Sequence, residues 1–380
     1  MVKQKIVICA NSSWNLLNFR SGLIRALIAS GYDVVALAPR DASTANVERL
    51  GCRFVELPMS PTGKGVFSNL RLLLRFFLVL RHERPDWFLG FTIKPNIFGS
   101  LAARLCGTRH INNITGLGSV FSERTMLTRL TIILYTFALA KSSCVFFQNS
   151  EDLNLFTNEG ILKNRLADLL PGSGVDLEHF HNHQIDAKSA INEANRTLSF
   201  ILVSRMLRDK GVVEFYEAAR SLLDSGLKAE FRLLGPIAEG REGVPLATIQ
   251  KWQDEGVVTY LGETDDVRPF VLASDCVVLP TFYREGVPRA LIEAAAMGRP
   301  LIATDVAGCR EIVIDKKNGY LCAPRSADDL AAKMQLFIDQ SKKNKEQMGR
   351  SSRAMVEQSF DEKFVINKYL DRVVAGSENI

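Results

Sequence analysis

Short apolar runs alternate with stretches of helical periodicity along the first 150 residues. Residues 5–10 form an apolar run that ends in polar residues 11–13, which is typical of a parallel strand covered on both faces. Residues 18–30 then carry apolar side chains at helical spacing up to Gly31. By the same criteria, further strands are predicted at 33–38, 54–57, 86–91, 110–114 and 144–148, and a helix at 95–105.

A second alternation of strands and helices begins at residue 198, after a polar stretch without a clear period. Strands are predicted at 198–203, 230–234, 258–261, 276–279 and 300–304, and helices at 212–223, 266–273, 290–297, 327–340 and 344–360. Two such series predict an α/β protein with two doubly wound Rossmann-like domains that face each other across a cleft. Ligands of open α/β sheets bind at the carboxyl ends of the strands.

The pattern breaks once, at Pro171-Gly172-Ser173-Gly174, and this break divides the chain. We expect an N-terminal domain over residues 1–175, a linker over 176–197 and a C-terminal domain over 198–360. Residues 361–380 are expected to form a C-terminal helix that could pack back on the N-terminal domain.

Composition narrows the class and the compartment. The chain has 380 residues, 47% of them hydrophobic, which excludes a disordered protein and favours more than one core. Its 7 cysteines are scattered and never form CxxC, so we expect neither a zinc site nor a disulfide framework, and a reducing cytosol fits best. The start of the chain does not read as a signal peptide. The apolar stretches at 70–80 and 130–140 have about half of the roughly 20 residues that a spanning helix needs.

Charge is unevenly distributed along the chain. Residues 1–150 hold 18 Lys and Arg against 7 Asp and Glu, whereas residues 151–380 hold 29 against 35. The first part therefore carries +11 and the rest −6. This asymmetry indicates that the first half meets an anionic partner.

The strongest chemical signal is the run Glu285-Gly286-Val287-Pro288-Arg289-Ala290-Leu291-Ile292-Glu293, which follows a predicted strand. Pro288 suits the first turn of a helix, where the N–H groups of Arg289 and Ala290 would form a phosphate site. Glu293 lies one turn deeper than Arg289 on the same face, and Glu285 and Glu293 could accept hydrogen bonds from the sugar hydroxyls of a nucleotide sugar. The alternative is that Glu285 caps the helix and Glu293 is a solvated charge.

The second signal is the loop Ser204-Arg205-Met206-Leu207-Arg208-Asp209-Lys210-Gly211, which follows another strand at the same carboxyl edge. Arg205 offers a planar fork to phosphate and Lys210 a mobile point charge. The two cations could bracket a diphosphate and stabilise the charge that develops on a leaving group. The alternative is an ordinary polar loop. Neither GxxxxGK[ST] nor GxGxxG is present, which argues against a P-loop kinase and a dinucleotide-dependent dehydrogenase.

These two loops and Leu234-Gly235-Pro236 resemble the family 4 retaining glycosyltransferases of the two-Rossmann (GT-B) type. The resemblance implies that Arg205 and Lys210 bind the nucleotide diphosphate, that Glu285 contacts the transferred sugar and that Glu293 contacts the ribose. It implies a catalytic set of Glu285, Arg205 and Lys210. The donor-binding set that it implies is Arg205, Lys210, Gly235, Glu285, Gly286, Val287, Arg289, Ala290 and Glu293.

The N-terminal half is similar to a bacterial branch of this family that extends glycans on undecaprenyl diphosphate, for example with N-acetylgalactosamine. The segments that carry this similarity are Asn18-Phe19-Arg20, Thr92-Ile93-Lys94-Pro95-Asn96, Asn113-Ile114-Thr115-Gly116-Leu117-Gly118, Gln148-Asn149 and Pro171-Gly172-Ser173-Gly174-Val175-Asp176. It implies an acceptor-binding N-terminal domain and a nucleotide-sugar-binding C-terminal domain. The acceptor-side residues that it implies are Asn18, Arg20, Lys94, Thr115 and Gly116. Many members carry a histidine near the reacting sugar, but His110 lies slightly upstream of that region and is expected to be structural.

The resemblance implies retaining transfer of a hexose or N-acetylhexosamine from a UDP-sugar to a lipid-linked (undecaprenyl diphosphate) saccharide, in surface-polysaccharide, O-antigen or protein-glycan assembly. No Asp-x-Asp and no cluster with metal-ligand spacing occurs, so we expect metal-independent transfer and no cofactor beyond the UDP-sugar substrate. Two alternatives stay open: a UDP-N-acetylhexosamine epimerase of similar build and an inactive sugar-nucleotide-binding scaffold. No nucleic-acid motif appears.

A lipid-linked acceptor would place the protein in the cytoplasm, peripheral at the inner face of the bacterial plasma membrane. An anionic membrane surface would attract the basic half, where Lys64, Arg71, Arg75, Arg81 and Arg84 lie around an unusually apolar predicted helix at 67–84. Such a helix could lie in the membrane interface, or it could be buried against the sheet with snorkelling arginines. Residues 127–140 leave the same two alternatives.

Overall fold

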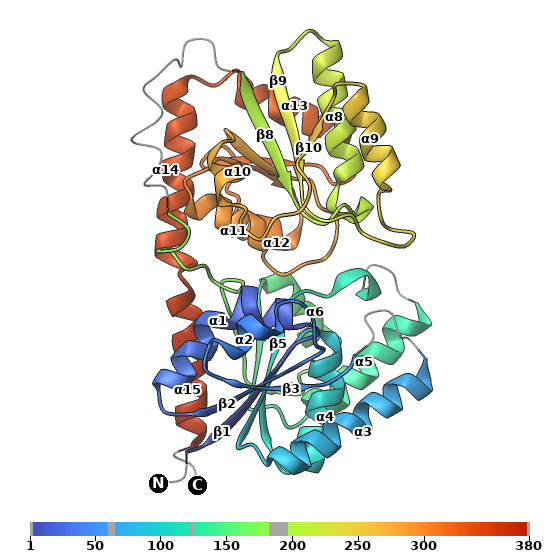
Figure 1. Cartoon of the computed structure of the whole chain (residues 1–380), viewed down its shortest axis with the longest axis vertical. Helices are drawn as coiled ribbons and strands as arrows, with labels where there is room; N and C mark the ends of the chain where they lie inside the picture. Colours follow the sequence, from blue (N-terminus) through green and yellow to red (C-terminus); the bar gives the residue numbers. More distant parts are fainter. Residues whose placement is uncertain (1–2, 60–64, 122–124, 182–196, 378–380) are drawn as a thin grey trace. The chain divides into compact units, whose positions relative to one another are not determined.

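The computed structural model describes residues 3–59, 65–121, 125–181 and 197–377, which form two compact units (Figure 1). Unit 1 comprises Met1–Gly174 and Glu362–Ile380, and unit 2 comprises Val175–Asp361. Most of the expected linker, residues 182–196, lies outside the described residues. The described residues 176–181 belong to unit 2.

Unit 1 is built on a parallel sheet of seven strands. In chain order these are β1 (Lys5–Cys9), β2 (Asp33–Ala38), β3 (Arg53–Glu56), β4 (Trp87–Phe91), β5 (Arg109–Ile114), β6 (Cys144–Phe147) and β7 (Ala167–Leu169). Their spatial order is β3-β2-β1-β4-β5-β6-β7. Strands β1, β4 and β6 are almost wholly apolar because helices cover both faces of the sheet, whereas β5 between them carries buried polar residues such as Asn112 and Asn113.

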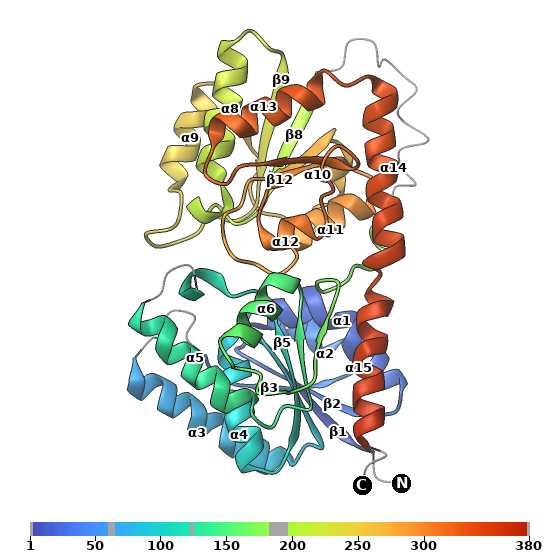
Figure 2. The same ribbon diagram turned by 180° about the vertical axis from the view of Figure 1, so that it is seen from behind.

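Helices cover the two faces of this sheet in two groups (Figures 1 and 2). One face packs on α3 (Val66–Glu83), α4 (Ser100–Leu105) and α5 (Met126–Leu139), through β-strand residues such as Val7 and Phe147. The other face packs on α1 (Ser13–Ala29) and α15 (Glu362–Ser377). Among the described residues, no helix combines the length and the apolar character needed to cross a membrane.

The C-terminal helix α15 is part of the core of unit 1. The ring of Tyr369 is fully buried and lies 4.9 Å from the ring of Phe146 and 5.8 Å from that of Phe91. The Asn113 side-chain amide donates to the Tyr369 hydroxyl at 3.0 Å. Burial raises the pKa of this hydroxyl well above its ordinary value, so it stays protonated.

Unit 2 holds a second parallel sheet, of six strands in the order β10-β9-β8-β11-β12-β13. The strands are β8 (Leu198–Val203), β9 (Ala229–Leu234), β10 (Thr259–Tyr260), β11 (Cys276–Leu279), β12 (Leu301–Thr304) and β13 (Gly319–Cys322). The helices are α8 (Val212–Asp224), α9 (Leu246–Asp254), α10 (Arg268–Leu272), α11 (Arg289–Ala296), α12 (Ala307–Arg310), α13 (Ala327–Ile338) and α14 (Lys342–Ser359). The two doubly wound sheets confirm the predicted fold class.

The structure differs from the sequence expectations at several boundaries. Helix α1 begins at Ser13 rather than residue 18, because the Ser12 hydroxyl caps it by accepting the N–H of Asn15 at 3.1 Å. The helix expected at 95–105 begins as a π-type turn, η1 (Pro95–Gly99), and continues as α4. The short edge strands β7 and β13 and the helices α6 (Ser150–Asn158) and α9 were not predicted.

We expect Tyr369→Ala to lower the free energy of unfolding of unit 1 by about 3–5 kcal/mol, the usual cost of removing a large buried aromatic ring. Phe364→Ala is the matched control, because Phe364 lies on the same helix with its side chain exposed. Urea unfolding of the full chain, followed by circular dichroism, measures both. Equal losses in the two variants would contradict a core position for α15.

Candidate functional site

The sheet of unit 2 has one topological switch point, between its central strands β8 and β11. From β8 the chain proceeds to β9 and β10 on one side, and it then crosses back to β11, β12 and β13 on the other. At such a point the loops that follow the two central strands separate at the carboxyl edge and leave room for a ligand. Here these loops are residues 204–211 after β8 and residues 280–288 after β11. They carry both motifs that the sequence singled out.

Hydrogen bonds to the Asp209 carbonyl connect the two loops. The Asp209 carbonyl accepts the N–H of Phe282 at 3.0 Å, the N–H of Tyr283 at 3.2 Å and the hydroxyl of Thr281 at 3.1 Å. Gly211 has φ +74°, and a Cβ at this position would lie 2.2 Å from the Pro280 carbonyl oxygen. Only glycine permits both this conformation and this approach of the two backbones.

Lys210 and Glu285 meet across the two loops. The Lys210 ammonium lies 2.6 Å from Glu285 Oε1, and the two side chains are 13% and 20% exposed. The ring of Tyr283 lies 5.4 Å from the same ammonium, within cation–π range. Burial raises the pKa of Tyr283, the Glu285 charge adds to the rise, and the charge of Arg205 opposes it. Arg205, Lys210, Tyr283 and Glu285 therefore form one electrostatic cluster.

The short helix α11 begins directly after this cluster. Pro288 is its N-cap, and the Pro288 carbonyl accepts the N–H groups of Leu291 and Ile292 at 3.1 and 3.2 Å. The first helical hydrogen bonds thus start after Arg289 and Ala290, whose N–H groups belong to the first turn that an anion can use. The structure places the predicted phosphate-binding turn beside Glu285.

Glu293 is not the solvated helix charge that the alternative interpretation expected. Its side chain is 16% exposed, and its Oε1 accepts a hydrogen bond from Arg289 Nε at 2.7 Å. Burial raises the pKa of Glu293, while Arg289 opposes the rise. A mostly buried carboxylate held by one arginine keeps acceptor capacity for a hydroxyl group.

Two glycines allow close backbone contacts around the same loops. Gly235, just after β9, has φ +137°, and a Cβ there would lie 2.0 Å from the Ser204 carbonyl oxygen next to Arg205. The Gly235 carbonyl also accepts the hydroxyl of Tyr260 at 2.9 Å. On the other side, Gly308 approaches the Gly286 carbonyl so closely that a Cβ would lie 1.5 Å from its oxygen. The predicted donor-side residues are thus gathered at one edge of unit 2.

The acceptor-side residues predicted in unit 1 do not all lie in one place in the structure. Lys94 follows β4, and Thr115 and Gly116 follow the neighbouring β5, so these three share the carboxyl edge of the sheet. Burial lowers the pKa of Lys94. Arg20 is buried, with its guanidinium 4.1 Å from the centre of the Phe91 ring, whereas Asn18 lies on the exposed side of α1. The expected set is therefore not a single cluster, because positions two apart on a helix face different ways.

Tyr283 and Thr92 are candidate residues that the sequence did not single out by themselves. Tyr283 lies two positions before Glu285. Its aromatic side chain in this loop is the one feature of the sequence that could have marked it as a site residue. Thr92 is β-branched but has φ +66°, directly after β4 at the switch point between β1 and β4 of unit 1. Its buried hydroxyl has no hydrogen-bond partner among the described residues. Such strain tends to collect at functional sites, but no sequence pattern reveals it.

The expected structural role of His110 agrees with its surroundings. It is buried on β5, and burial lowers its pKa to about 4, so it is neutral near pH 7. Across the described residues, no three His, Cys, Asp or Glu side chains are grouped so that they could hold a metal ion.

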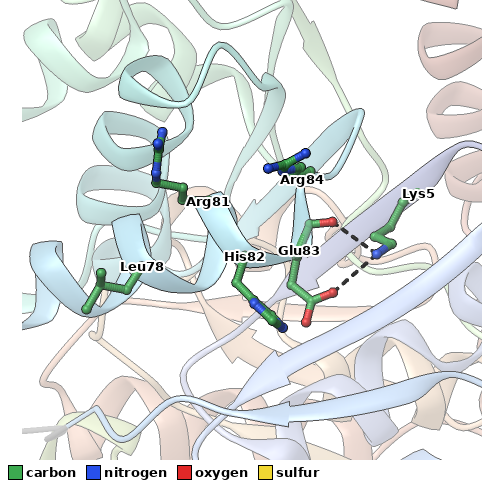
Figure 3. Close-up of a pocket in the computed structure, with 6 residues that line it drawn as sticks. All are labelled: Lys5, Leu78, Arg81, His82, Glu83 and Arg84. Carbon is green, nitrogen blue, oxygen red and sulfur yellow. Dashed lines mark hydrogen bonds and ion pairs between the residues drawn. The ribbon is translucent and has the colours of Figure 1, made fainter.

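A cavity of about 650 Å³ lies at the opposite, amino-terminal edge of the unit 1 sheet (Figure 3). It is lined by Lys5, Leu78, Arg81, His82, Glu83 and Arg84. Lys5 Nζ donates to the Glu83 carbonyl at 3.0 Å and to its carboxylate at 3.4 Å. Arg53, followed by Lys5, holds the pKa of Glu83 below its ordinary value. This carboxylate is neutralised within the fold, and the cavity contains none of the predicted site residues.

Two family models match the chain, one for each half. The model of the glycosyl transferase 4-like domain matches residues 19–171, and the model of glycosyl transferases group 1 matches residues 183–355. The second match contains both loops of the unit 2 switch point.

Relatives of known activity and solved structures are similar over most of the chain. The N,N'-diacetylbacillosaminyl-diphospho-undecaprenol alpha-1,3-N-acetylgalactosaminyltransferase of Campylobacter jejuni is 26% identical, over 97% of this chain and 99% of the relative. The UDP-Gal:alpha-D-GlcNAc-diphosphoundecaprenol alpha-1,3-galactosyltransferase of Escherichia coli is 25% identical over 67% of each chain. Sucrose-phosphate synthase from Thermosynechococcus elongatus superposes with a TM-score of 0.78 at 18% identity, over 99% of this chain and 100% of that one.

We expect Gly211→Ala to disrupt the switch-point loops far more than its conformational strain alone would. Gly226→Ala is the matched control, because Gly226 has φ +86° but a Cβ there would have no neighbour within 4 Å. The control should lose about 1–2 kcal/mol of unfolding free energy, the cost of a left-handed non-glycine residue. Gly211→Ala should lose clearly more, because the Pro280 backbone must also shift. Denaturant unfolding measures both, and equal losses would show that the close approach is unimportant.

Proposed function

We propose that this chain transfers a hexose or N-acetylhexosamine from a UDP-sugar to a saccharide on undecaprenyl diphosphate. The chain belongs to the two-domain GT-B glycosyltransferases. Its N-terminal half is a glycosyl transferase 4-like domain and its C-terminal half a glycosyl transferases group 1 domain. The observation that carries the proposal is the meeting of Lys210 and Glu285 at the switch point of unit 2. The names of the two bacterial relatives support a lipid-diphosphate acceptor, and that of the Escherichia coli relative also supports a UDP-sugar.

In the proposed donor complex, Arg205 and Lys210 hold the diphosphate while the first turn of α11 contributes N–H groups. Glu285 exchanges Lys210 for a hydroxyl of the transferred sugar, and Glu293 accepts a hydrogen bond from the ribose. The Lys210–Glu285 pair keeps both groups in place until the donor arrives, because each satisfies the charge of the other at a partly buried position.

The proposed reaction retains the configuration of the anomeric carbon. The bond from this carbon to the β-phosphate oxygen breaks, and a bond to the acceptor hydroxyl oxygen forms on the same side of the sugar. The hydroxyl proton passes to the departing phosphate oxygen. This route needs no histidine from the C-terminal half, and the sequence from residue 184 onward contains none.

The proposed source of charge stabilisation is the protein itself. Negative charge grows on the departing diphosphate in the transition state, and fixed cations close to it lower the barrier. Arg205, Lys210 and the α11 N-terminus would fill the role that a divalent cation has in other transferases. Turnover that is indifferent to EDTA would support this, and loss of turnover that Mg²⁺ or Mn²⁺ restores would refute it.

We expect Arg205→Ala and Lys210→Ala each to lower kcat by about 10²–10³, the usual effect of removing one donor from a developing charge. Arg208→Ala is the control, because Arg208 is an exposed arginine of the same loop outside the proposed diphosphate contacts. Steady-state UDP release with donor and acceptor measures all three. Wild-type turnover in Arg205→Ala and Lys210→Ala would contradict the diphosphate assignment.

We expect Glu285→Gln to reduce kcat by more than it weakens UDP binding. The amide keeps the size of the side chain but loses the charge that holds the sugar hydroxyl, and UDP carries no transferred sugar. Titration calorimetry with UDP and turnover assays provide the comparison. Equal losses in affinity and turnover would place Glu285 in nucleotide binding instead.

On the acceptor side, we propose that Lys94, Thr115 and Gly116 at the carboxyl edge of unit 1 receive the lipid-linked saccharide. The excess of cations in the first 150 residues would attract the anionic inner face of the plasma membrane, where each basic residue close to the surface adds about 1 kcal/mol. The protein would then act in the cytoplasm as a peripheral membrane enzyme, in surface-polysaccharide or glycan assembly.

One experiment separates this function from its alternatives. The full chain is incubated with UDP- and GDP-hexoses and N-acetylhexosamines, with and without undecaprenyl-diphosphate-linked saccharides, and the products are identified by mass. The proposal predicts a glycolipid one sugar larger, formed together with free nucleoside diphosphate. Conversion of a UDP-N-acetylhexosamine without acceptor would indicate an epimerase, and donor binding without turnover would indicate a scaffold.

A further inference from the structure

Helix α3 has an apolar side that the protein does not cover. One side of the helix, with Leu72, Phe76 and Leu80, is buried against the sheet of unit 1. The other side bears four exposed large apolar residues: Phe67, Leu70, Leu74 and Leu78. The expected burial against the sheet is therefore confirmed for one side of this helix, and the exposed apolar side leaves the membrane-interface alternative open.

Helices α4 and α5 lie on the same face of the sheet as α3 (Figures 1 and 2). They carry exposed apolar side chains as well. The C-terminal residue of α4, Leu105, is exposed, as are five large apolar residues of α5: Met126, Leu127, Leu130, Ile133 and Phe137. Arg104 of α4 donates to the Phe137 carbonyl and links the two helices. We call the ten exposed apolar residues of these three helices the docking face. They are 41–89% exposed, which is unusual for so many neighbouring residues of a soluble surface.

The charges around the docking face are almost all positive. Its three helices contain the basic residues Arg71, Arg75, Arg81, Arg104 and Arg129 and a single acidic residue, Glu83. The Glu83 carboxylate is already bound by Arg53 and Lys5. At the end of α3, Leu78 borders the cavity that Arg81, His82 and Arg84 also line (Figure 3). An apolar strip with flanking cations is typical of helices that lie in the interface of an anionic membrane.

The position of the docking face within unit 1 relates it to the acceptor side. Helices that connect parallel strands run opposite to them, so α3 and α5 begin at the carboxyl edge of the sheet. Their first described apolar side chains, Phe67 and Met126, are each 89% exposed. Lys94 and Thr115 lie at this same edge of unit 1.

We propose that the docking face inserts into the headgroup region of the leaflet that it meets in an anionic lipid bilayer, with Phe67 and Met126 entering the acyl region and the arginines binding headgroup phosphates. This inference rests on the proposed function, because it identifies the surface that brings the enzyme to its lipid-linked acceptor. A second copy of the chain is the weaker candidate for the occupant, since pairing two such faces would bring arginines against arginines.

Flotation of the full chain with lipid vesicles tests the docking face. Vesicles of phosphatidylcholine alone are compared with vesicles that also contain the anionic lipid phosphatidylglycerol, at low and high salt, because the attraction of basic residues depends on anionic lipid and is screened by salt. Phe67→Ser/Met126→Ser should lower the bound fraction at least about tenfold. The matched control is Leu166→Ser/Leu336→Ser, which removes two exposed leucines elsewhere and should stay within about twofold of wild type. Arg71→Gln/Arg129→Gln should lose the preference for anionic vesicles and its dependence on salt.

Sedimentation without lipid identifies the competing occupant. If the wild-type chain sediments as a dimer and the Phe67→Ser/Met126→Ser variant as a monomer, the lipid assignment is overturned. Equal vesicle binding by the apolar variant and its control, or no vesicle binding by the wild type, would also overturn it.

A transfer assay keeps this inference separate from the proposed function. Phe67→Ser/Met126→Ser should retain wild-type transfer to a short-chain, water-soluble diphosphate acceptor and lose at least about tenfold on a long-chain acceptor in vesicles. Vesicle binding through the docking face without transfer to any acceptor would refute the proposed function but support the membrane-binding role of the docking face. Normal transfer to the long-chain acceptor by the variant would refute that membrane-binding role but support the proposed function.

Discussion

The arrangement of the candidate site depends on the contact between two loops at the switch point of unit 2. Gly211 lets the backbone after β8 approach Pro280 after β11, and the Asp209 carbonyl accepts three hydrogen bonds from the second loop. Without this approach Lys210 and Glu285, which are 75 positions apart, would not lie 2.6 Å from one another. The pairing of a cation with a carboxylate therefore follows from the strand order, because only strands β8 and β11 bring these loops to the same place.

The two units use positive charge in different ways. Unit 2 derives from a part of the chain with net negative charge, yet it positions two cations and a helix N-terminus at one edge of its sheet. The basic first half spreads its cations over exposed helices beside apolar side chains. A few fixed charges in partly buried positions suit a small anionic ligand, whereas dispersed charges on a surface suit an extended anionic partner. Under the proposed function, net charge alone would have assigned the donor diphosphate to unit 1 rather than to unit 2.

Much of the fold and of the unit 2 site could be predicted from sequence, because the alternation of apolar runs and helical periods is a local property of the chain. The strands β1, β2, β8 and β11 and the loops with Lys210 and Glu285 were found in this way. What depends on tertiary contacts was not found: the two-residue offset that buries Arg20 but exposes Asn18, the strain at Thr92, and the burial of Glu293. Strand β7 has only three residues, too few for a period to appear. Strand β13 has four, as many as β11, but it opens on Gly319 directly after the polar run 315–318, so it does not stand out as an apolar run.

A crystal structure of the full chain with UDP, and with the UDP-sugar that supports turnover, tests the central claim most directly. The account predicts that Lys210 leaves Glu285 and lies within about 3 Å of a phosphate oxygen, with Arg205 on the same diphosphate. In the UDP-sugar complex, the Glu285 carboxylate should accept a hydrogen bond from a hydroxyl of the sugar. A nucleotide bound elsewhere, with the Lys210–Glu285 contact still at 2.6 Å, would contradict the account.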